Sequence, residues 1–302
     1  MSRPLRLRRS QLSVPGSNEK MVAKAVASAA DHVFLDLEDA VAPSAKAGAR
    51  KIIVEALNEL DWGRKTRCVR INDVTTEWCF EDVIEVVEGA GRNLDTIMLT
   101  KARGPADVQF VSLLLDQLEA KLKLERPIGI EVLIEEAIGL QNVESIAVSS
   151  PRLECLIFGM GDYSASQQMQ IRSIGAAEGY PGDVFHYPRF RIAMAARAAG
   201  LDPVDGPYAN FRNEDGYRRE ARMAFTLGFA GKWAIHPSQI APALEIFSPS
   251  ESEVARARKL ADAYDKALAE GVGSVNVDGV MVDAASIRII MNTVRRADLI
   301  GM

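Results

Sequence analysis

The sequence predicts an α/β protein, a closed (β/α)8 TIM barrel followed by a C-terminal helical and hairpin extension. Eight short apolar runs of strand length lie between residues 11 and 247, and amphipathic stretches of helix length separate them. The unit repeats about every 30 residues, as expected for a barrel of about 250 residues. A doubly wound open sheet would also alternate, but its G-x-G-x-x-G motif does not follow the first run.

The eight runs are predicted to be the barrel strands. Each is rich in β-branched residues or leucine and is bounded by Gly, Pro, Asp or Asn. They cover residues 11–14, 33–37, 68–71, 96–99, 128–134, 153–159, 201–204 and 231–235. The clearest helical periodicity falls over residues 46–60, with Ser44 as the expected N-cap, and over residues 106–122, 193–199 and 217–227.

The character of the sequence changes after Pro249, which predicts a barrel domain over residues 1–249 and an extension over 250–302. The extension is expected to contain a charged helix, a glycine break, a hairpin around Asp278-Gly279 and a last helix, at residues 251–269, 271–273, 275–283 and 284–296. So small a segment buries little core of its own. We therefore expect it to pack on the barrel or on a neighbouring subunit.

The composition excludes several classes of protein. Of 302 residues, 48% are hydrophobic and 25% charged, which is ample for a large core and unlike a disordered chain. The formal charge of −5 argues against nucleic-acid partners, and the absence of an apolar run of about 18 residues argues against a membrane. Three scattered cysteines fit buried thiols, and the basic N-terminus lacks the apolar stretch of a secretory signal. We expect a cytoplasmic protein.

Ionisable residues close most of the predicted strands. Helix capping explains one acidic residue at such a position. It explains Arg70 and Lys101 poorly, because cations are unfavourable at the start of a helix. Strands of a barrel deliver their C-terminal ends to one rim, where barrel enzymes carry their active sites. The acids expected on this rim are Glu38, Asp39, Glu135, Asp162 and Asp205.

The residue types on this rim suggest a metal site. Carboxylate oxygens suit Mg²⁺ or Mn²⁺, and the rim offers no Cys/His cluster. Glu135 and Asp162 end adjacent runs and are expected to share one ion, whereas helix capping is the alternative for both. Such a metal binds an oxo-acid or hydroxy-acid, and Arg70 would add a second positive charge at the same oxygen. The pattern favours a metal-dependent lyase or isomerase.

Several strings resemble the citrate lyase β-subunit-like family of CoA-dependent lyases, in the HpcH/HpaI aldolase superfamily, and above all its malyl-CoA and β-methylmalyl-CoA lyases. The most specific are Asp-Leu-Glu-Asp-Ala-Val-Ala-Pro at residues 36–43 and Gly-Lys-Trp-Ala-Ile-His-Pro at residues 231–237. The remaining matches, in order and at compatible spacing, are at residues 13–17, 61–65, 69–72, 134–135, 161–166, 203–207 and 279–286.

The resemblance implies a TIM barrel in a homo-oligomer, a trimer or hexamer, that uses Mg²⁺ and a CoA thioester. By position, Glu135 and Asp162 match the metal ligands and Arg70 the catalytic arginine. Asp283 matches a catalytic acid that a neighbouring subunit brings over the active site. Glu38 and Asp39 are expected to orient Arg70 and metal-bound water.

The resemblance also implies a cofactor-binding loop near the N-terminus. The turn that contains Ser13 and Gly16 would face CoA, with Arg9 and Lys20 as partners for its phosphates. Without the resemblance, Arg9 and the neighbouring Arg8 would be part of a solvated tail. His32 is expected at the surface, at the end of a helix.

The implied reaction is a reversible, Mg-dependent retro-Claisen cleavage of a β-hydroxyacyl-CoA. Malyl-CoA would yield acetyl-CoA and glyoxylate, and β-methylmalyl-CoA would yield propionyl-CoA and glyoxylate. The alternatives are a citramalyl-CoA lyase that uses pyruvate, a (3S)-malyl-CoA thioesterase, and a non-catalytic assembly subunit of a larger lyase complex. The loop at residues 167–187 looks shorter than in malyl-CoA lyases and lies near the expected oxo-acid pocket.

Overall fold

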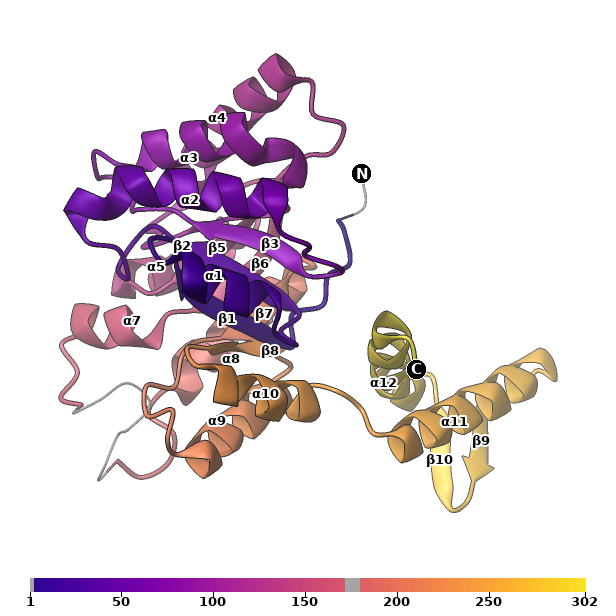
Figure 1. The fold of residues 1–302 in the computed structure, drawn as a ribbon. Coiled ribbons are helices and arrows are strands. Elements are labelled where there is room, and N and C mark those ends of the chain that lie inside the picture. Colours follow the sequence, from indigo (N-terminus) through magenta and orange to yellow (C-terminus); the bar gives the residue numbers. More distant parts are fainter. Residues whose placement is uncertain (1–2, 172–179) are drawn as a thin grey trace. The chain divides into compact units, whose positions relative to one another are not determined.

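The computed structural model describes residues 3–171 and 180–302, and its main feature is a closed eight-stranded parallel barrel (Figure 1). Each strand pairs with the next in sequence, and the last pairs with the first through Lys232 and Ser10. The strands are β1 (Ser10–Pro15), β2 (His32–Asp36), β3 (Thr66–Arg70), β4 (Thr96–Leu99), β5 (Gly129–Ile134), β6 (Leu153–Phe158), β7 (Asp202–Asp205) and β8 (Gly231–Ala234). The predicted TIM barrel is confirmed, and every predicted run is a strand.

Helices connect the strands, as the sequence periodicity predicts. They are α1 (Glu19–Val26), α2 (Lys46–Glu59), α3 (Cys79–Ala90), α4 (Pro105–Leu122), α5 (Ala137–Gln141), α6 (Val143–Ala147), α7 (Met160–Ser166), α8 (His186–Ala198), α9 (Glu214–Thr226) and α10 (Ile240–Ile246). Ser44 does not cap α2, because it lies inside a short 3₁₀ turn that begins at Pro43. None of the helices in the described ranges combines the length and apolar character that crossing a bilayer requires.

Side chains that point to the barrel axis form an apolar belt between two polar ends. Successive strand residues face opposite sides, so alternate residues fill the interior. The apolar belt consists of Phe34, Cys68, Met98, Leu133, Cys155, Ile157, Val204 and Trp233. Two strand residues beyond Phe34 and Cys68, at the C-terminal ends, the interior turns polar with Asp36 and Arg70.

A buried ion network fills the N-terminal end of the barrel. The Arg8 guanidinium lies 2.7 Å from Glu154 Oε2 and 3.2 Å from Glu131 Oε1, and Nε2 of His32 lies 3.2 Å from the same Glu131 oxygen. The expectations of a solvated Arg8 and a surface His32 are therefore wrong, because both side chains are buried inside the barrel and contact Glu131. His32, Cys68 and Glu131 also bring potential metal ligands within 4.8 Å of one another. Since Glu131 already accepts from Arg8, a cation there would face a guanidinium.

Replacing Arg8 by methionine is expected to lower the free energy of unfolding by about 3–5 kcal/mol, because Glu131 and Glu154 lose their buried counter-ion. Urea denaturation of the full chain measures this loss. The matched control is Arg197→Met, which breaks a half-exposed pair with Asp202 and should cost less than about 1 kcal/mol. Equal small losses in both variants would show that Arg8 is not a buried counter-ion.

The residues from Glu245 onward form a second compact unit, distinct from the unit of Arg8–Leu244. It contains α11 (Glu251–Ala269), the hairpin strands β9 (Ser274–Val277) and β10 (Val280–Asp283), and α12 (Ser286–Ile300). The predicted hairpin turn is present: Asp278 and Gly279 both have positive φ, 52° and 80°, as a two-residue turn between twisted strands requires. Ser250 and Glu253 form a capping box at the start of α11.

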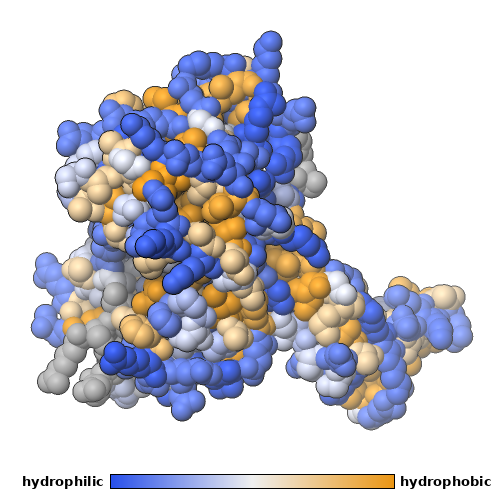
Figure 2. All heavy atoms as spheres, viewed as in Figure 1, coloured by the Kyte–Doolittle hydropathy of each residue, from blue (hydrophilic) through white to orange (hydrophobic). Residues whose placement is uncertain are grey.

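The C-terminal unit buries few apolar side chains. Its core consists of Leu260, Tyr264 and Val282, with a few half-buried neighbours. Met281 and Ile289 are 69% and 72% exposed, and hydrophobic residues lie among hydrophilic ones on the visible face of this unit (Figure 2). Exposed apolar residues on so small a unit are typical of a segment that acquires contacts from a partner.

Candidate active site

An arginine–aspartate pair lies at the C-terminal ends of two neighbouring strands. Asp36 ends β2 and Arg70 ends β3, and the two are register partners in the sheet. The guanidinium donates from Nε to Asp36 Oδ1 at 2.7 Å and from Nη2 to Oδ2 at 2.5 Å. It also lies 5.8 Å and 5.6 Å from the ring centres of Phe34 and Trp233 in the apolar belt. Strand register and aromatic packing therefore hold the guanidinium in one orientation.

This pair keeps both of its charges although it is buried. Burial opposes ionisation of Asp36, but the Arg70 guanidinium outweighs it and holds the pKa of the carboxyl below its usual range. Burial likewise disfavours the charged form of Arg70, and Asp36 and Glu38 outweigh it, so the pKa of Arg70 is raised. Nη1 of Arg70 lies 3.1 Å from Glu38 Oε2. A permanent positive charge is thus fixed at the rim.

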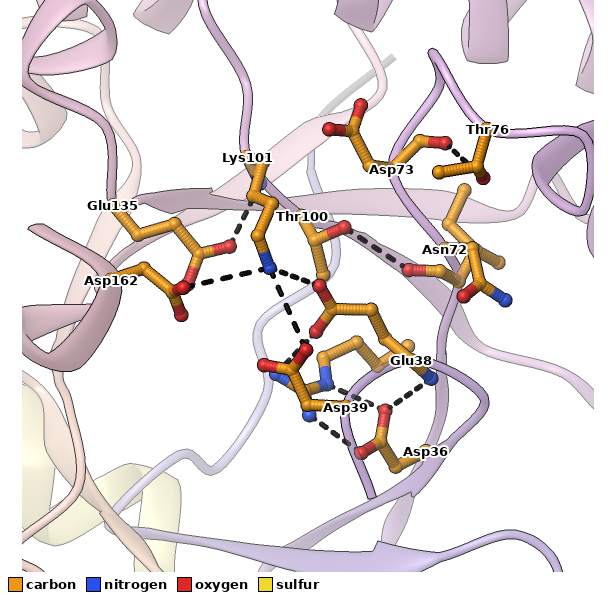
Figure 3. A network of polar contacts seen from close by, with 12 residues as sticks. Asp36, Glu38, Asp39, Asn72, Asp73, Thr76, Thr100, Lys101, Glu135 and Asp162 are labelled. Atoms are coloured by element: carbon orange, nitrogen blue, oxygen red, sulfur yellow. Dashed lines mark hydrogen bonds and ion pairs between the residues drawn. The ribbon is translucent and has the colours of Figure 1, made fainter. Parts of the chain in front are cut away.

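Lys101 lies beside this pair, just after β4, and reaches several carboxylates (Figure 3). Its ammonium forms an ion pair with Glu38 and lies 3.8 Å from Asp39 Oδ1 and 3.7 Å from Asp162 Oδ1. Glu38 thus bridges the two cations at the rim, Arg70 and Lys101. Asp39 is exposed, and Lys101 is the cation it meets here.

The two predicted metal ligands come together on this rim. Glu135 directly follows β5 and is buried, and its Oε1 accepts a hydrogen bond from the main-chain N–H of Lys101 at 2.8 Å. Asp162 lies in the first turn of α7, after the neighbouring strand β6, with a side chain 40% exposed. Figure 3 shows both carboxyl groups directed to the same space beside the Lys101 ammonium.

The residues present fit a hard divalent cation. A Cβ on Gly159 would lie 2.5 Å from Glu135 Oε2, so the absence of a side chain there makes room for the carboxyl group. Glu38 Oε2 is buried and finds no hydrogen-bond donor within the described ranges, only its ion pair with Arg70. Two carboxylates from adjacent strands, one buried and one open to solvent, match the one or two protein ligands that Mg²⁺ commonly takes.

Burial and the neighbouring charges of Glu38 and Asp162 raise the pKa of Glu135 to about 8. Near pH 7 the metal-free carboxyl is therefore mostly protonated, whereas a metal ligand must be ionised. We expect Mg²⁺ to displace nearly one proton at pH 6.5–7 and to bind more tightly as the pH rises to about 8, with little further gain above it. Calorimetric titration in buffers of different ionisation enthalpy counts the released proton. Binding heat independent of the buffer at pH 6.5 would contradict this expectation.

The predicted cofactor-binding residues lie at two different ends of the barrel. Ser13 and Gly16 are on the C-terminal rim, at the end of β1, and Lys20 is exposed in the first turn of α1. Arg9 precedes β1 at the opposite end, about 20 Å away along a six-residue strand, and donates to Asp31 at 2.8 Å. The structure therefore does not bring Arg9 together with the loop.

The Gly16 turn is closed rather than open to a ligand. Its N–H donates to Asp36 O at 2.9 Å, and a Cβ there would approach the same oxygen to 2.7 Å. The glycine is required by this close approach. Any phosphate contact by this loop therefore depends on other donors, such as Lys20.

Asp283 ends β10 in the C-terminal unit, where its side chain is fully exposed. Its Oδ1 accepts from the main-chain N–H groups of Ser286 and Ala285, at 2.8 Å and 3.1 Å. These hydrogen bonds, first of all that of Ser286, lower the pKa of the Asp283 carboxyl. The carboxyl is therefore an ionised group, oriented by the turn between β10 and α12.

Two functional residues, Asp36 and Lys101, were not assigned a role by sequence reasoning. The sequence did contain evidence for Asp36. In a strand, Asp36 and Glu38 point to the same side, and Asp36 holds the same position near the end of its run as Arg70 does in the next run. Lys101 was noted as a cation where helix capping favours an acid, but its contacts were not predictable because its position depends on a left-handed backbone (φ 48°).

The fold and this rim define the class: a TIM-barrel protein with paired carboxylates and a fixed arginine at its C-terminal face. Residues 9–237 match the HpcH/HpaI aldolase/citrate lyase family, and the chain belongs to this family. The predicted family resemblance is thus confirmed.

Similar proteins cover almost the whole chain. An L-malyl-CoA/β-methylmalyl-CoA lyase of Cereibacter sphaeroides is 44% identical over 99% of this chain and 97% of its own. A (3S)-malyl-CoA thioesterase of the same species is 35% identical over 97% and 95%. Among solved structures, the CitE protein of Mycobacterium tuberculosis in complex with magnesium, acetoacetate and coenzyme A has a TM-score of 0.76 and 30% identity, covering 96% of this chain and 97% of that one.

Proposed function

We propose that this protein is a Mg-dependent carbon–carbon lyase that reversibly cleaves malyl-CoA or β-methylmalyl-CoA to glyoxylate and acetyl-CoA or propionyl-CoA. The proposal rests on the position of Glu135, Asp162 and Arg70 on one rim of the barrel, linked through Glu38 and Lys101. The 44% identical lyase supports the choice of substrate, and the magnesium in the CitE complex supports the metal. Mn²⁺ is the alternative ion.

Each residue has a distinct task in this reaction. Magnesium held by Glu135 and Asp162 would bind the carboxylate and adjacent oxygen of the glyoxylate half and withdraw charge from them. Arg70 would face the thioester oxygen, where negative charge develops as the carbon–carbon bond breaks, and would stabilise the enolate. Asp36 and Glu38 hold the guanidinium in place for this step. Because Asp36 takes Nε and Nη2, the two N–H groups of Nη1 would serve Glu38 and the substrate.

The proton for the enolate carbon is assigned to Asp283 of a neighbouring subunit. This assignment is supported by the exposure of the carboxyl and by the small core of the C-terminal unit. The lowered pKa keeps the Asp283 carboxyl ionised, which is the form that a base needs in the condensing direction. Since Asp283 is assigned to a neighbouring subunit, we propose a homo-oligomer, a trimer or hexamer. We also propose that CoA binds on the rim near Ser13 and Lys20, and that the protein works in the cytoplasm.

The test is to incubate the purified full chain with Mg²⁺, acetyl-CoA or propionyl-CoA, and glyoxylate or pyruvate, and to identify the products by mass. Malyl-CoA or β-methylmalyl-CoA from glyoxylate is the expected result. Citramalyl-CoA formed from acetyl-CoA and pyruvate would assign the alternative oxo-acid. The loop at residues 167–187, expected to decide this preference, lies partly outside the described residues.

A hydrolase is the second candidate, because the thioesterase relative is 35% identical to this chain. It would release free CoA and malate from malyl-CoA, whereas the lyase releases acetyl-CoA and glyoxylate. A thiol-reactive dye distinguishes the two, since only hydrolysis yields a free thiol. No turnover with any of these substrates would favour an assembly subunit of a larger lyase complex.

A further inference from the structure

The ammonium of Lys101 occupies the middle of the carboxylate cluster, although the proposed reaction assigns it no step. It pairs with Glu38, and it lies 3.7 Å from Asp162 Oδ1 and 3.8 Å from Asp39 Oδ1. Figure 3 shows it between the carboxyl groups of Glu38 and Asp162. Its side chain is only 19% exposed, so solvent screens these contacts incompletely.

The backbone of Lys101 is held in an unfavourable conformation. Its φ of 48° lies in the left-handed region, which favours glycine and is uncommon for other residues. Such a conformation persists where the surrounding contacts over-determine it. Here the main-chain N–H donates to Glu135 Oε1 at 2.8 Å while the side chain reaches Asp162. One residue thus contacts both proposed metal ligands, by two different groups.

Acidic side chains outnumber basic ones around Lys101. Arg70 is committed to Asp36 through two hydrogen bonds and to Glu38 through its third nitrogen. Lys101 is therefore the cation that reaches Asp162. A divalent cation between Glu135 and Asp162 would lie close to this ammonium, and like charges at such a distance repel strongly in a partly buried site.

We propose that the Lys101 ammonium is the built-in counter-ion of this carboxylate cluster and lowers the affinity of the site for divalent cations. In the metal-free protein the ammonium pairs with Glu38 and reduces the repulsion between Glu38 and Asp162. A divalent cation competes with it for Asp162, while the main-chain N–H of Lys101 continues to position Glu135. Lys101 is therefore a positioning residue, and the inference rests on the proposed function because it uses the same metal ligands.

The test is calorimetric titration of Mg²⁺ into the full-length protein and its Lys101→Met variant. We expect the variant to bind Mg²⁺ at least about tenfold more tightly, because the repelling charge is gone. Its Tm without metal should fall, and saturating Mg²⁺ should raise it by more than in the wild type. Lys101→Arg keeps the positive charge and should retain a Kd near that of the wild type.

The matched control is Lys121→Met, which removes an ammonium paired with Glu88 on an exposed helix and should leave the Kd unchanged. Equal or weaker Mg²⁺ binding by Lys101→Met would overturn the inference and leave the metal site standing. A wild-type protein that binds no Mg²⁺ would overturn the proposed function as well. If Lys101→Met does not fold, Lys101→Gln in the same titration decides, with tighter binding expected.

Discussion

Replacing Arg70 by alanine should lower kcat by about a hundredfold to a thousandfold, comparable to the loss of one oxyanion donor. The guanidinium is the fixed positive charge beside the metal ligands, and water cannot replace it at a defined position. Steady-state assay of malyl-CoA cleavage, read by acetyl-CoA release, measures the effect. Mg²⁺ affinity should not fall, because Arg70 is not a ligand.

The same substitution leaves Asp36 buried without its partner, so a stability control is required. Removal of one member of a buried ion pair costs about 3–5 kcal/mol. The double variant Arg70→Ala/Asp36→Asn removes the second charge and should recover part of this loss without recovering turnover. A double variant that regained both stability and activity would show that Arg70 acts only through folding.

Substitution of Glu135 by glutamine should weaken Mg²⁺ binding more than about a hundredfold and abolish measurable cleavage, because even the outer partners of metal ligands contribute 10–100-fold. The amide keeps the size of the side chain and removes its charge. Calorimetric titration of Mg²⁺ and the cleavage assay are the two measurements.

The chain offers a matched control in the next residue. Glu136 directs its carboxylate elsewhere and accepts a hydrogen bond from Ser166 Oγ at 2.8 Å. Glu136→Gln should retain Mg²⁺ affinity and kcat within about threefold of the wild type, because consecutive residues of extended chain face opposite sides. Equal losses in the two variants would argue that general negative charge, rather than ligation by Glu135, attracts the metal.

Much of the fold was predictable because burial imposes a period on the sequence. Strands such as β5 and β6 are buried on both faces and appear as apolar runs that a single glutamate interrupts, so their positions followed mainly from hydrophobicity. The start of α8 was missed, because the sequence His186–Ala198 begins with aromatic and basic residues that do not show a helical period. The cap of α2 was missed since Pro43 initiates a turn before the helix.

The site was predictable only where chemistry and position coincide. Glu135 and Asp162 directly follow strands or open the next helix, and Arg70 is a cation where capping favours an acid. The pairings of Arg8 and Arg9 were not predictable: Glu131, the partner of Arg8, lies across the barrel on β5, and the contact of Arg9 with Asp31 depends on the register of β1 and β2. Such partners depend on tertiary contacts that no local pattern encodes.

The apolar belt separates the charged groups at the two ends of the barrel. Asp36 and His32 are four residues apart on one strand, about 13 Å along its axis. At that separation substitutions usually add without interacting. Charged residues at the C-terminal rim can therefore be substituted to suit another substrate, while the ion network at the opposite end continues to stabilise the barrel.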